Sequence, residues 1–172
     1  MIESAWNDLA KPFVEVPFDV ALLRLSASLI LGAVIGWERE AARKGAGLRT
    51  HLMVSMAACL FTLVAFELVG LFDESTAVEA DPLGLIGAVT SGVAFLAAGS
   101  IIVSGGKVHG LTTGAGLWLA GAIGLTCGIG RVPLAALATF MAFVVLRVLI
   151  YLVPGEADEE EAPAPPPKTD ET

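Results

Sequence analysis

Charged residues are scarce in this sequence, and their scarcity limits the class of protein it can be. They make up 16% of the 172 residues, whereas hydrophobic residues make up 55% and the mean hydropathy is +0.77. Soluble domains carry about 25% charged residues, so the composition excludes an ordinary water-soluble domain. The length fits one domain of roughly 100–200 residues. We therefore expect a single domain whose solvent is a lipid bilayer.

Cysteine and histidine are also scarce, with two of each. Cys59 and Cys127 lie inside apolar runs and match no metal-ligand spacing, which is typical of small packed side chains. HExxH and GxSxG motifs are absent, and the glycines before Lys107 lack the first glycine and the final Ser or Thr of a P-loop. The net charge of −8 disfavours binding to a polyanion. We expect no enzymatic activity, no cofactor and no nucleic-acid partner.

Five apolar runs reach the ~20 residues that a helix needs to cross the hydrocarbon core. The runs are Asp19–Trp37, Thr50–Phe72, Leu83–Ser104, Leu111–Ile129 and Val132–Val153. Backbone groups in lipid must be hydrogen-bonded within a helix or a closed barrel, and barrel strands would alternate over about ten residues. These runs do not alternate. The sequence therefore predicts an all-α, polytopic membrane protein with about five transmembrane helices.

The basic residues in the loops predict the orientation of the chain. Residues 38–49 include three arginines and Lys44, and residues 105–110 include Lys107 and His109. Residues 73–82 contain four acids and no base. We therefore expect the first and third loops in the cytoplasm, with the N-terminus outside the bacterial inner membrane and the C-terminus inside.

The composition divides the chain into three parts. Residues 1–18 are expected to form an outer-face N-terminal segment, either an amphipathic anchor or a plain loop. Residues 19–153 are expected to form the transmembrane domain. Residues 154–172 are rich in proline and hold seven acids against one lysine. They cannot bury enough apolar surface to fold, so we expect a disordered cytoplasmic tail.

Ionisable residues inside a membrane are costly and each needs a reason. The predicted topology brings Arg24, Glu67 and Asp81 to one level near the outer face. In one interpretation the acids hold Arg24 in a buried ion pair, and in the other they form a cation or proton site. Asp81 and Glu67 could then contact a hydrated Mg²⁺, which keeps most of its waters. Asp81 and Pro82 also fit the N-cap and first turn of a helix.

Two further features leave alternatives open. The basic residues near the first loop either anchor helices to anionic lipid or, at Arg49 and His51, form an anion or partner site. Three glycine pairs have the small-xxx-small spacing of close helix contacts, which serve either packing within one subunit or a homodimer. The pairs are Gly32–Gly36, Gly110–Gly114 and Gly124–Gly128.

Four motifs occur in one order along the chain, and together they resemble the MgtC/SapB family. They are RLSASLILGAVIGWERE at 24–40, KGAGLRTH at 44–51, DPLGLIGAVTSGVAFLAAGSII at 81–102 and GKVHGLTTGAGLWLAGAIGLTCGIG at 106–130. Matching positions at the cytoplasmic face are Glu38, Arg39, Arg49, Thr50 and His51, and those in the third and fourth helices are Ser91, Gly92, Thr112, Thr113 and Trp118. The family usually reads TTAATLW where this chain has TTGAGLW, so Gly114 and Gly116 replace other small residues.

The resemblance implies a multi-pass inner-membrane protein linked to magnesium homeostasis, to virulence and to inhibition of the F-type ATP synthase. Two functions follow as expectations. The first is a non-enzymatic regulator that acts through helix contacts, either with a membrane protein such as that synthase or in a homodimer. The second is a permease or channel for Mg²⁺ or another cation, which would use the acids of the outer face.

Overall fold

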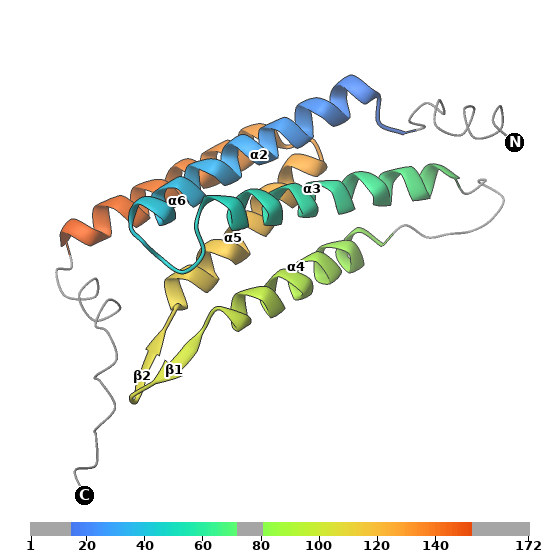
Figure 1. The fold of residues 1–172 in the computed structure, drawn as a ribbon. Coiled ribbons are helices and arrows are strands. Elements are labelled where there is room, and N and C mark those ends of the chain that lie inside the picture. The colour runs from blue at the N-terminus through green and yellow to red at the C-terminus, as the bar shows by residue number, and fades with distance from the viewer. Residues whose placement is uncertain (1–14, 72–80, 153–172) are drawn as a thin grey trace, which may run out of the picture.

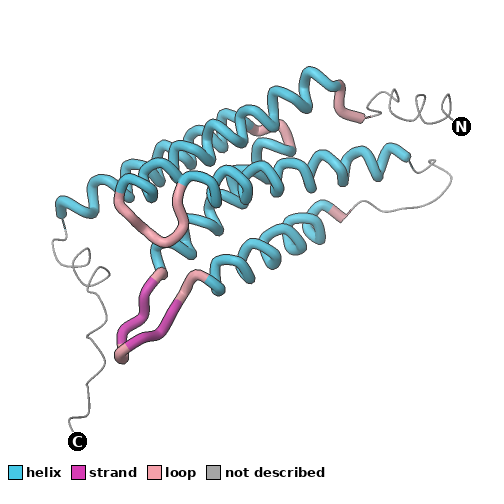
Figure 2. Tube along the Cα trace, viewed as in Figure 1, coloured by secondary structure: helices cyan, strands magenta, loops and turns pink. Residues whose placement is uncertain are grey.

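The computed structural model describes residues 15–71 and 81–152, which form five helices and one short β-hairpin (Figures 1 and 2). The elements are α2 (Phe18–Ala41), α3 (Leu48–Leu71), α4 (Pro82–Gly99), β1 (Ile102–Ser104), β2 (Lys107–His109), α5 (Leu111–Gly128) and α6 (Val132–Leu152). The helical content confirms the predicted all-α, polytopic class. The expectations for residues 1–14 and 153–172 lie outside the described residues.

Each helix matches one of the predicted apolar runs. By length and hydropathy, α2, α3 and α5 are long and apolar enough to span a membrane, while α4 and α6 hold shorter apolar stretches. Large apolar side chains cover the outside, including Leu83, Phe95 and Phe140, which are 76%, 81% and 65% exposed. Such a surface suits lipid, where apolar exposure carries no penalty.

The third predicted run is wrong at its C-terminal end. We expected a helix as far as Ser104, but α4 ends at Gly99 and the chain continues into an antiparallel hairpin with Ser104 opposite Lys107. Gly105 and Gly106 form its two-residue turn with φ of +60° and +78°. A turn with two positive φ angles strongly prefers glycine, and its twist matches that of the strands. The Gly-Gly dipeptide, with Val103 two residues before it and Val108 two residues after it, was therefore the sequence signal for a hairpin. The high hydropathy of this stretch had instead led us to extend the helix.

The glycine pairs pack helices together within the chain. A Cβ on Gly36 would lie 2.8 Å from Leu48 Cα, and one on Gly124 would lie 2.9 Å from Ser55 Cα, so both glycines press against the α3 backbone. A Cβ on Gly114 would lie 3.1 Å from the Ala97 carbonyl of α4. This confirms the first interpretation of the spacing, in which the glycines pack one subunit.

Helix α5 is the centre of this packing. It contacts α2, α3, α4 and α6, and 61% of its residues are buried. Helix α4 packs mainly on α5 and contacts α3 only slightly, so it forms the edge of the bundle (Figure 1). Buried alanines at 58, 97 and 120 lie in the core that joins α3, α4 and α5.

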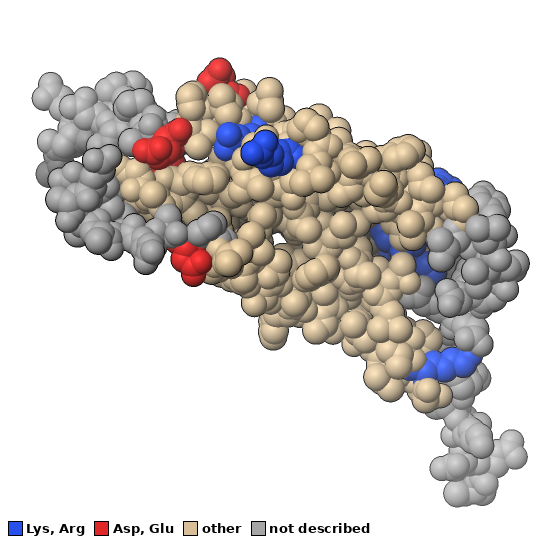
Figure 3. Space-filling view, turned by 180° about the vertical axis from the view of Figure 1, so that it is seen from behind, with Lys and Arg blue, Asp and Glu red and all other residues tan. Residues whose placement is uncertain are grey.

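Charges separate toward the two ends of the bundle (Figure 3). Acidic side chains gather on the visible face near the end where α2 begins, and lysines and arginines lie mainly at the opposite end, with one further basic group near the acids. The α2–α3 loop and the β-hairpin share the second end with the end of α6 (Figure 1). The first and third loops, which we expected at the same membrane face, therefore lie at the same end of the bundle.

Two glycine substitutions test this packing. Gly124→Ala should lower the free energy of unfolding by about 1–3 kcal/mol, because its methyl group would overlap the α3 backbone at Ser55. Gly87→Ala on α4 meets no atom within 4 Å and should be neutral or slightly stabilising. Unfolding in mixed micelles measures both. Equal effects of the two substitutions would contradict the glycine-mediated contact.

Candidate functional site

A buried polar group lies where the end of α2 meets the start of α3. Glu38 and Arg39 occupy the last turns of α2, and His51 lies in the first turn of α3. Their exposed fractions are 2%, 2% and 0%. Charged residues are almost never fully buried unless they are paired, so this group is the strongest candidate site among the described residues.

The two charges of this group lie side by side. Arg39 Nε is 3.0 Å from Glu38 Oε2, an ion-pair distance, but the atoms lack the alignment of a hydrogen bond. The imidazole of His51 lies within electrostatic range of both. Its Nδ1 is 2.8 Å from the Gly47 carbonyl, and an oxygen acceptor there requires the proton on Nδ1. In the neutral form of the ring, the lone pair then lies on Nε2, which faces the interior.

Four polar atoms of this group have no hydrogen-bond partner among the described residues. They are Glu38 Oε2, Arg39 Nε, Arg39 Nη1 and His51 Nε2. A buried polar atom without a partner costs about 1–3 kcal/mol, and more when it is charged. Natural structures contain few such atoms, and here they cluster at one point, which makes this group a candidate site.

Glycine 116 on α5 brings a third helix to this group. A Cβ at this position would lie 3.1 Å from His51 Nε2 and 3.8 Å from Arg39 Cδ. Thr113, one turn earlier on α5, is also buried. A side chain at this position would crowd the imidazole, so glycine favours the close approach of α5, and the group is enclosed by α2, α3 and α5.

The other positions predicted at this end are exposed. Arg49 and Thr50 lie on the outside of the first turn of α3, although they neighbour the buried His51. Glu40 accepts a hydrogen bond from Leu48 N at 2.9 Å. Its negative carboxylate therefore stabilises the partial positive charge at the N-terminus of α3. The structure thus groups Glu38, Arg39 and His51, and leaves Arg49 and Thr50 at the surface.

The three residues predicted near the outer face each have backbone partners in different elements. Arg24 Nη1 donates to the Gly128 carbonyl at 2.7 Å, at the negative end of α5. Glu67 Oε1 accepts from the backbone N–H of Glu15 at 3.2 Å and of Val16 at 3.0 Å. Asp81 Oδ1 accepts from Gly84 N at 2.9 Å and is the N-cap of α4.

The contacts of Asp81 and Glu67 can be compared with the two interpretations of the outer acids, an ion pair with Arg24 or a cation or proton site. The predicted N-cap role of Asp81 is confirmed, and Pro82 occupies the first turn of α4. Within residues 15–71 and 81–152, no group of three or more His, Cys, Asp or Glu side chains is placed to hold a metal. The cation site at Asp81 and Glu67 stays a prediction, because two carboxylates could still contact a hydrated ion.

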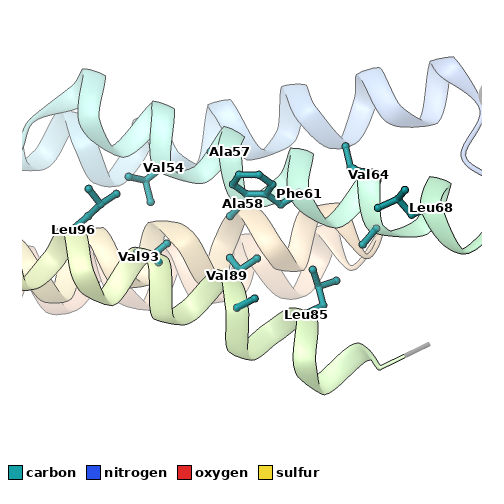
Figure 4. A pocket seen from close by; sticks show the side chains of 13 residues that line it. Val54, Ala57, Ala58, Phe61, Val64, Leu68, Leu85, Val89, Val93 and Leu96 are labelled. Atoms are coloured by element: carbon teal, nitrogen blue, oxygen red, sulfur yellow. The ribbon is translucent and has the colours of Figure 1, made fainter. Parts of the chain in front are cut away.

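The predicted positions of the third and fourth helices lie on several faces. Ser91, Gly92, Thr112 and Trp118 are exposed, whereas Thr113 is buried. Gly92 lines an apolar groove of about 540 Å³ between α3 and α4 (Figure 4). Its other walls are apolar side chains of both helices, among them Val54, Phe61, Leu68, Leu85, Val89 and Leu96.

Comparison with known proteins identifies the family. A sequence profile of the MgtC family matches residues 25–153, which is most of the chain. The chain belongs to the MgtC family. It is 38% identical over 130 residues to the protein of Escherichia coli K12 named "Putative magnesium transporter YhiD", covering 74% of this chain and 59% of that one. It is 35% identical over 129 residues to the protein of Brucella abortus named "Protein MgtC", covering 75% and 51%.

The chain therefore spans about half of the length of the curated MgtC relatives that it matches. No solved structure matches it. The buried group falls on two of the four motifs that carry the resemblance, at GWERE in the first and GLRTH in the second. Gly116, one of the positions where this chain departs from the family pattern, faces His51 Nε2.

Some residues of the site were missed from sequence. Ser55 Oγ donates to the Ser28 carbonyl at 2.9 Å, and both serines are fully buried between α2 and α3. Gly116 gave no signal of its contact with His51, because that contact depends on the rotation of α5. The only available signal was the departure from the family pattern at that position.

A double-mutant cycle tests whether Glu38 and Arg39 act as a pair. Glu38→Gln or Arg39→Met alone should lower the free energy of unfolding by about 3–5 kcal/mol, since each leaves one buried charge unpaired. The double variant should cost less than the sum of the two. Unfolding in mixed micelles measures the cycle, with Arg49→Met as the exposed control, within about 0.5 kcal/mol of wild type. Additive costs would show that the two charges are not coupled.

Proposed function

We propose that this MgtC-family chain is a non-enzymatic regulator in the bacterial inner membrane, linked to magnesium homeostasis and membrane energetics. It acts by contact between α4 and a helix of another membrane protein. The basic end of the bundle faces the cytoplasm, in keeping with the loop charges, which places the start of α2 outside and the end of α6 inside.

The proposal is based on one observation: some glycines of the bundle lie against a neighbouring helix, whereas several glycines of α4 do not. A Cβ on a glycine at a helix contact, such as Gly36 or Gly128, would collide with the neighbouring helix. A Cβ on Gly87, Gly92 or Gly99 of α4 would meet nothing within 4 Å. Small residues let helices approach closely in lipid, where packing and hydrogen bonds drive association. The open glycines of α4 suit a helix from outside the chain.

The groove beside α4 fits the same partner. It is apolar, it borders Gly92, and it lies at the edge of the bundle where α3 and α4 have little contact (Figure 4). A transmembrane helix that covered Gly92 would gain dispersion contacts with both walls. The F-type ATP synthase is the partner that the family resemblance implies, and a second copy of this chain is the other candidate.

Co-reconstitution with the F-type ATP synthase tests this function. Wild-type protein should reduce ATP-driven proton pumping in proteoliposomes, and Gly92→Leu should abolish most of that reduction by filling the groove. Ser26→Leu is the matched control, because Ser26 is exposed on α2, away from the groove. A photo-crosslinker at Phe95 should join a synthase subunit. Unchanged pumping together with a crosslinked homodimer would contradict the regulatory contact with the synthase.

A cation permease is the second candidate, favoured by the printed name of the Escherichia coli relative. Our proposal expects no Mg²⁺ uptake above empty liposomes for wild type, Asp81→Asn or Asp81→Ala. Asn keeps the N-cap hydrogen bond while Ala loses about 1 kcal/mol, so the first variant removes the charge without the cap. Uptake by wild type that is lost in Asp81→Asn would overturn the regulatory proposal and assign entry to the outer acids.

A further inference from the structure

A second cavity, of about 360 Å³, lies at the basic end of the bundle. Its walls come from three segments that are far apart in the sequence: the α2–α3 loop, the end of α4 with the hairpin, and the start of α5. The lining residues are Ala42, Arg43, Lys44, Gly45, Ala46, Ser100, Ile102, His109, Gly110 and Thr113. The cavity is separate from the apolar groove beside α4 and from the buried Glu38 and Arg39.

The charge of the cavity wall has one sign. Among the described residues, Arg43, Lys44 and His109 are the ionisable ones that line it, and no described aspartate or glutamate does. The nearest acid on the loop side, Glu40, accepts a hydrogen bond from Leu48 N. Arg43 has the left-handed φ of 53° because it follows the C-cap of α2, where Arg43 N donates to the Glu40 carbonyl and Lys44 N to the Arg39 carbonyl. The described part of the wall therefore carries two cationic side chains and an imidazole.

The start of α5 adds to this field. Gly110 is the N-cap of this 18-residue helix and provides no side-chain cap. The first turn of a helix carries a partial positive charge that favours an anion. Thr113, in that turn, lines the cavity with its side chain almost fully buried. The helix end reinforces the basic wall but is not needed to define the cavity.

The apolar hairpin beside the cavity indicates where the anion comes from. Ile102 lines the cavity and is 62% exposed, and Val103 and Val108 on the same hairpin are 71% and 50% exposed. Apolar side chains beside basic ones are typical of a segment at the boundary between headgroups and acyl chains. An anion that met both surfaces would need a charged group attached to an apolar one.

We propose that this cavity binds the phosphate group of an anionic phospholipid. Arg43 and Lys44 contact the phosphate, the start of α5 lies at its back, and Ile102 of the hairpin contacts the glycerol and first acyl carbons. Clusters of basic residues next to membrane helices attract anionic lipids in this way. The proposal depends neither on the regulatory function nor on the orientation of the chain, because phospholipids occupy both leaflets.

Native mass spectrometry of the full chain in detergent measures lipid binding directly. Short-chain phosphatidylglycerol should bind more tightly than phosphatidylcholine. Arg43→Asn with Lys44→Gln should weaken phosphatidylglycerol roughly 10- to 30-fold, from the contribution of two basic residues near an anionic surface. Asn is chosen at position 43 because it tolerates a positive φ. Arg49→Gln is the matched control, since Arg49 is exposed at the same end and does not line the cavity.

Two further arms separate the sources of the phosphate group. Ile102→Ser should weaken phosphatidylglycerol binding severalfold, whereas Val103→Ser, on the opposite face of the hairpin, should not. Inorganic phosphate titrated by calorimetry should bind far more weakly than the lipid. Equal binding of the two lipids, or equal loss in Arg49→Gln, would overturn the proposal. The lipid proposal would also fail if inorganic phosphate bound as tightly as the lipid. A further contrary result would be lipid binding that occurs only when the acids of residues 156–171 are neutralised by substitution. Circular dichroism of each variant confirms that the helices are intact.

Discussion

The close approach of α5 to α3 is the contact on which the rest of the structure depends. Lipid gives helices no hydrophobic reason to associate, so the bundle relies on dispersion between backbones that glycine allows to meet. Gly124 and Gly128 place α5 directly against the α3 backbone, and Gly32 and Gly36 do the same for α2. The hydrogen bond from Ser55 to the Ser28 carbonyl links α2 to α3 in the same layer.

The position of α5 then sets both ends of the molecule. At one end its last carbonyls come within reach of Arg24, which stabilises the negative end of the helix. At the other end Gly116 faces His51, and the first turn forms the back of the basic cavity. Lys44, which lines that cavity, donates its backbone N–H to the Arg39 carbonyl at 3.1 Å. The cavity and the buried charge pair are therefore connected through one short loop.

Sequence reasoning succeeded where a pattern has a single physical solution. Apolar length identified the helices, the glycine spacing identified close contacts, and Asp81 before Pro82 identified a helix start. It failed where the outcome depends on the rotation of a helix. The hydrogen bond from Arg24 to the Gly128 carbonyl of α5, for example, was not predicted. Hydropathy also concealed the hairpin, because strand and helix use the same apolar residues there.

Exposed apolar surface does not by itself indicate a partner for a membrane protein, because lipid covers it at no cost. The glycines of α4 are a different case. In water a glycine within a helix is less favourable than alanine by about 1 kcal/mol, and it offers fewer atoms for dispersion contact. In α2 and α5 that loss is offset by backbones that meet at the glycine. In α4, a Cβ added at Gly87, Gly92 or Gly99 would meet no atom of the described residues within 4 Å, which leaves room there for the contact from outside the chain that we propose. Helix α4 therefore differs from the equally exposed α6 in its open glycines and not in its hydrophobicity.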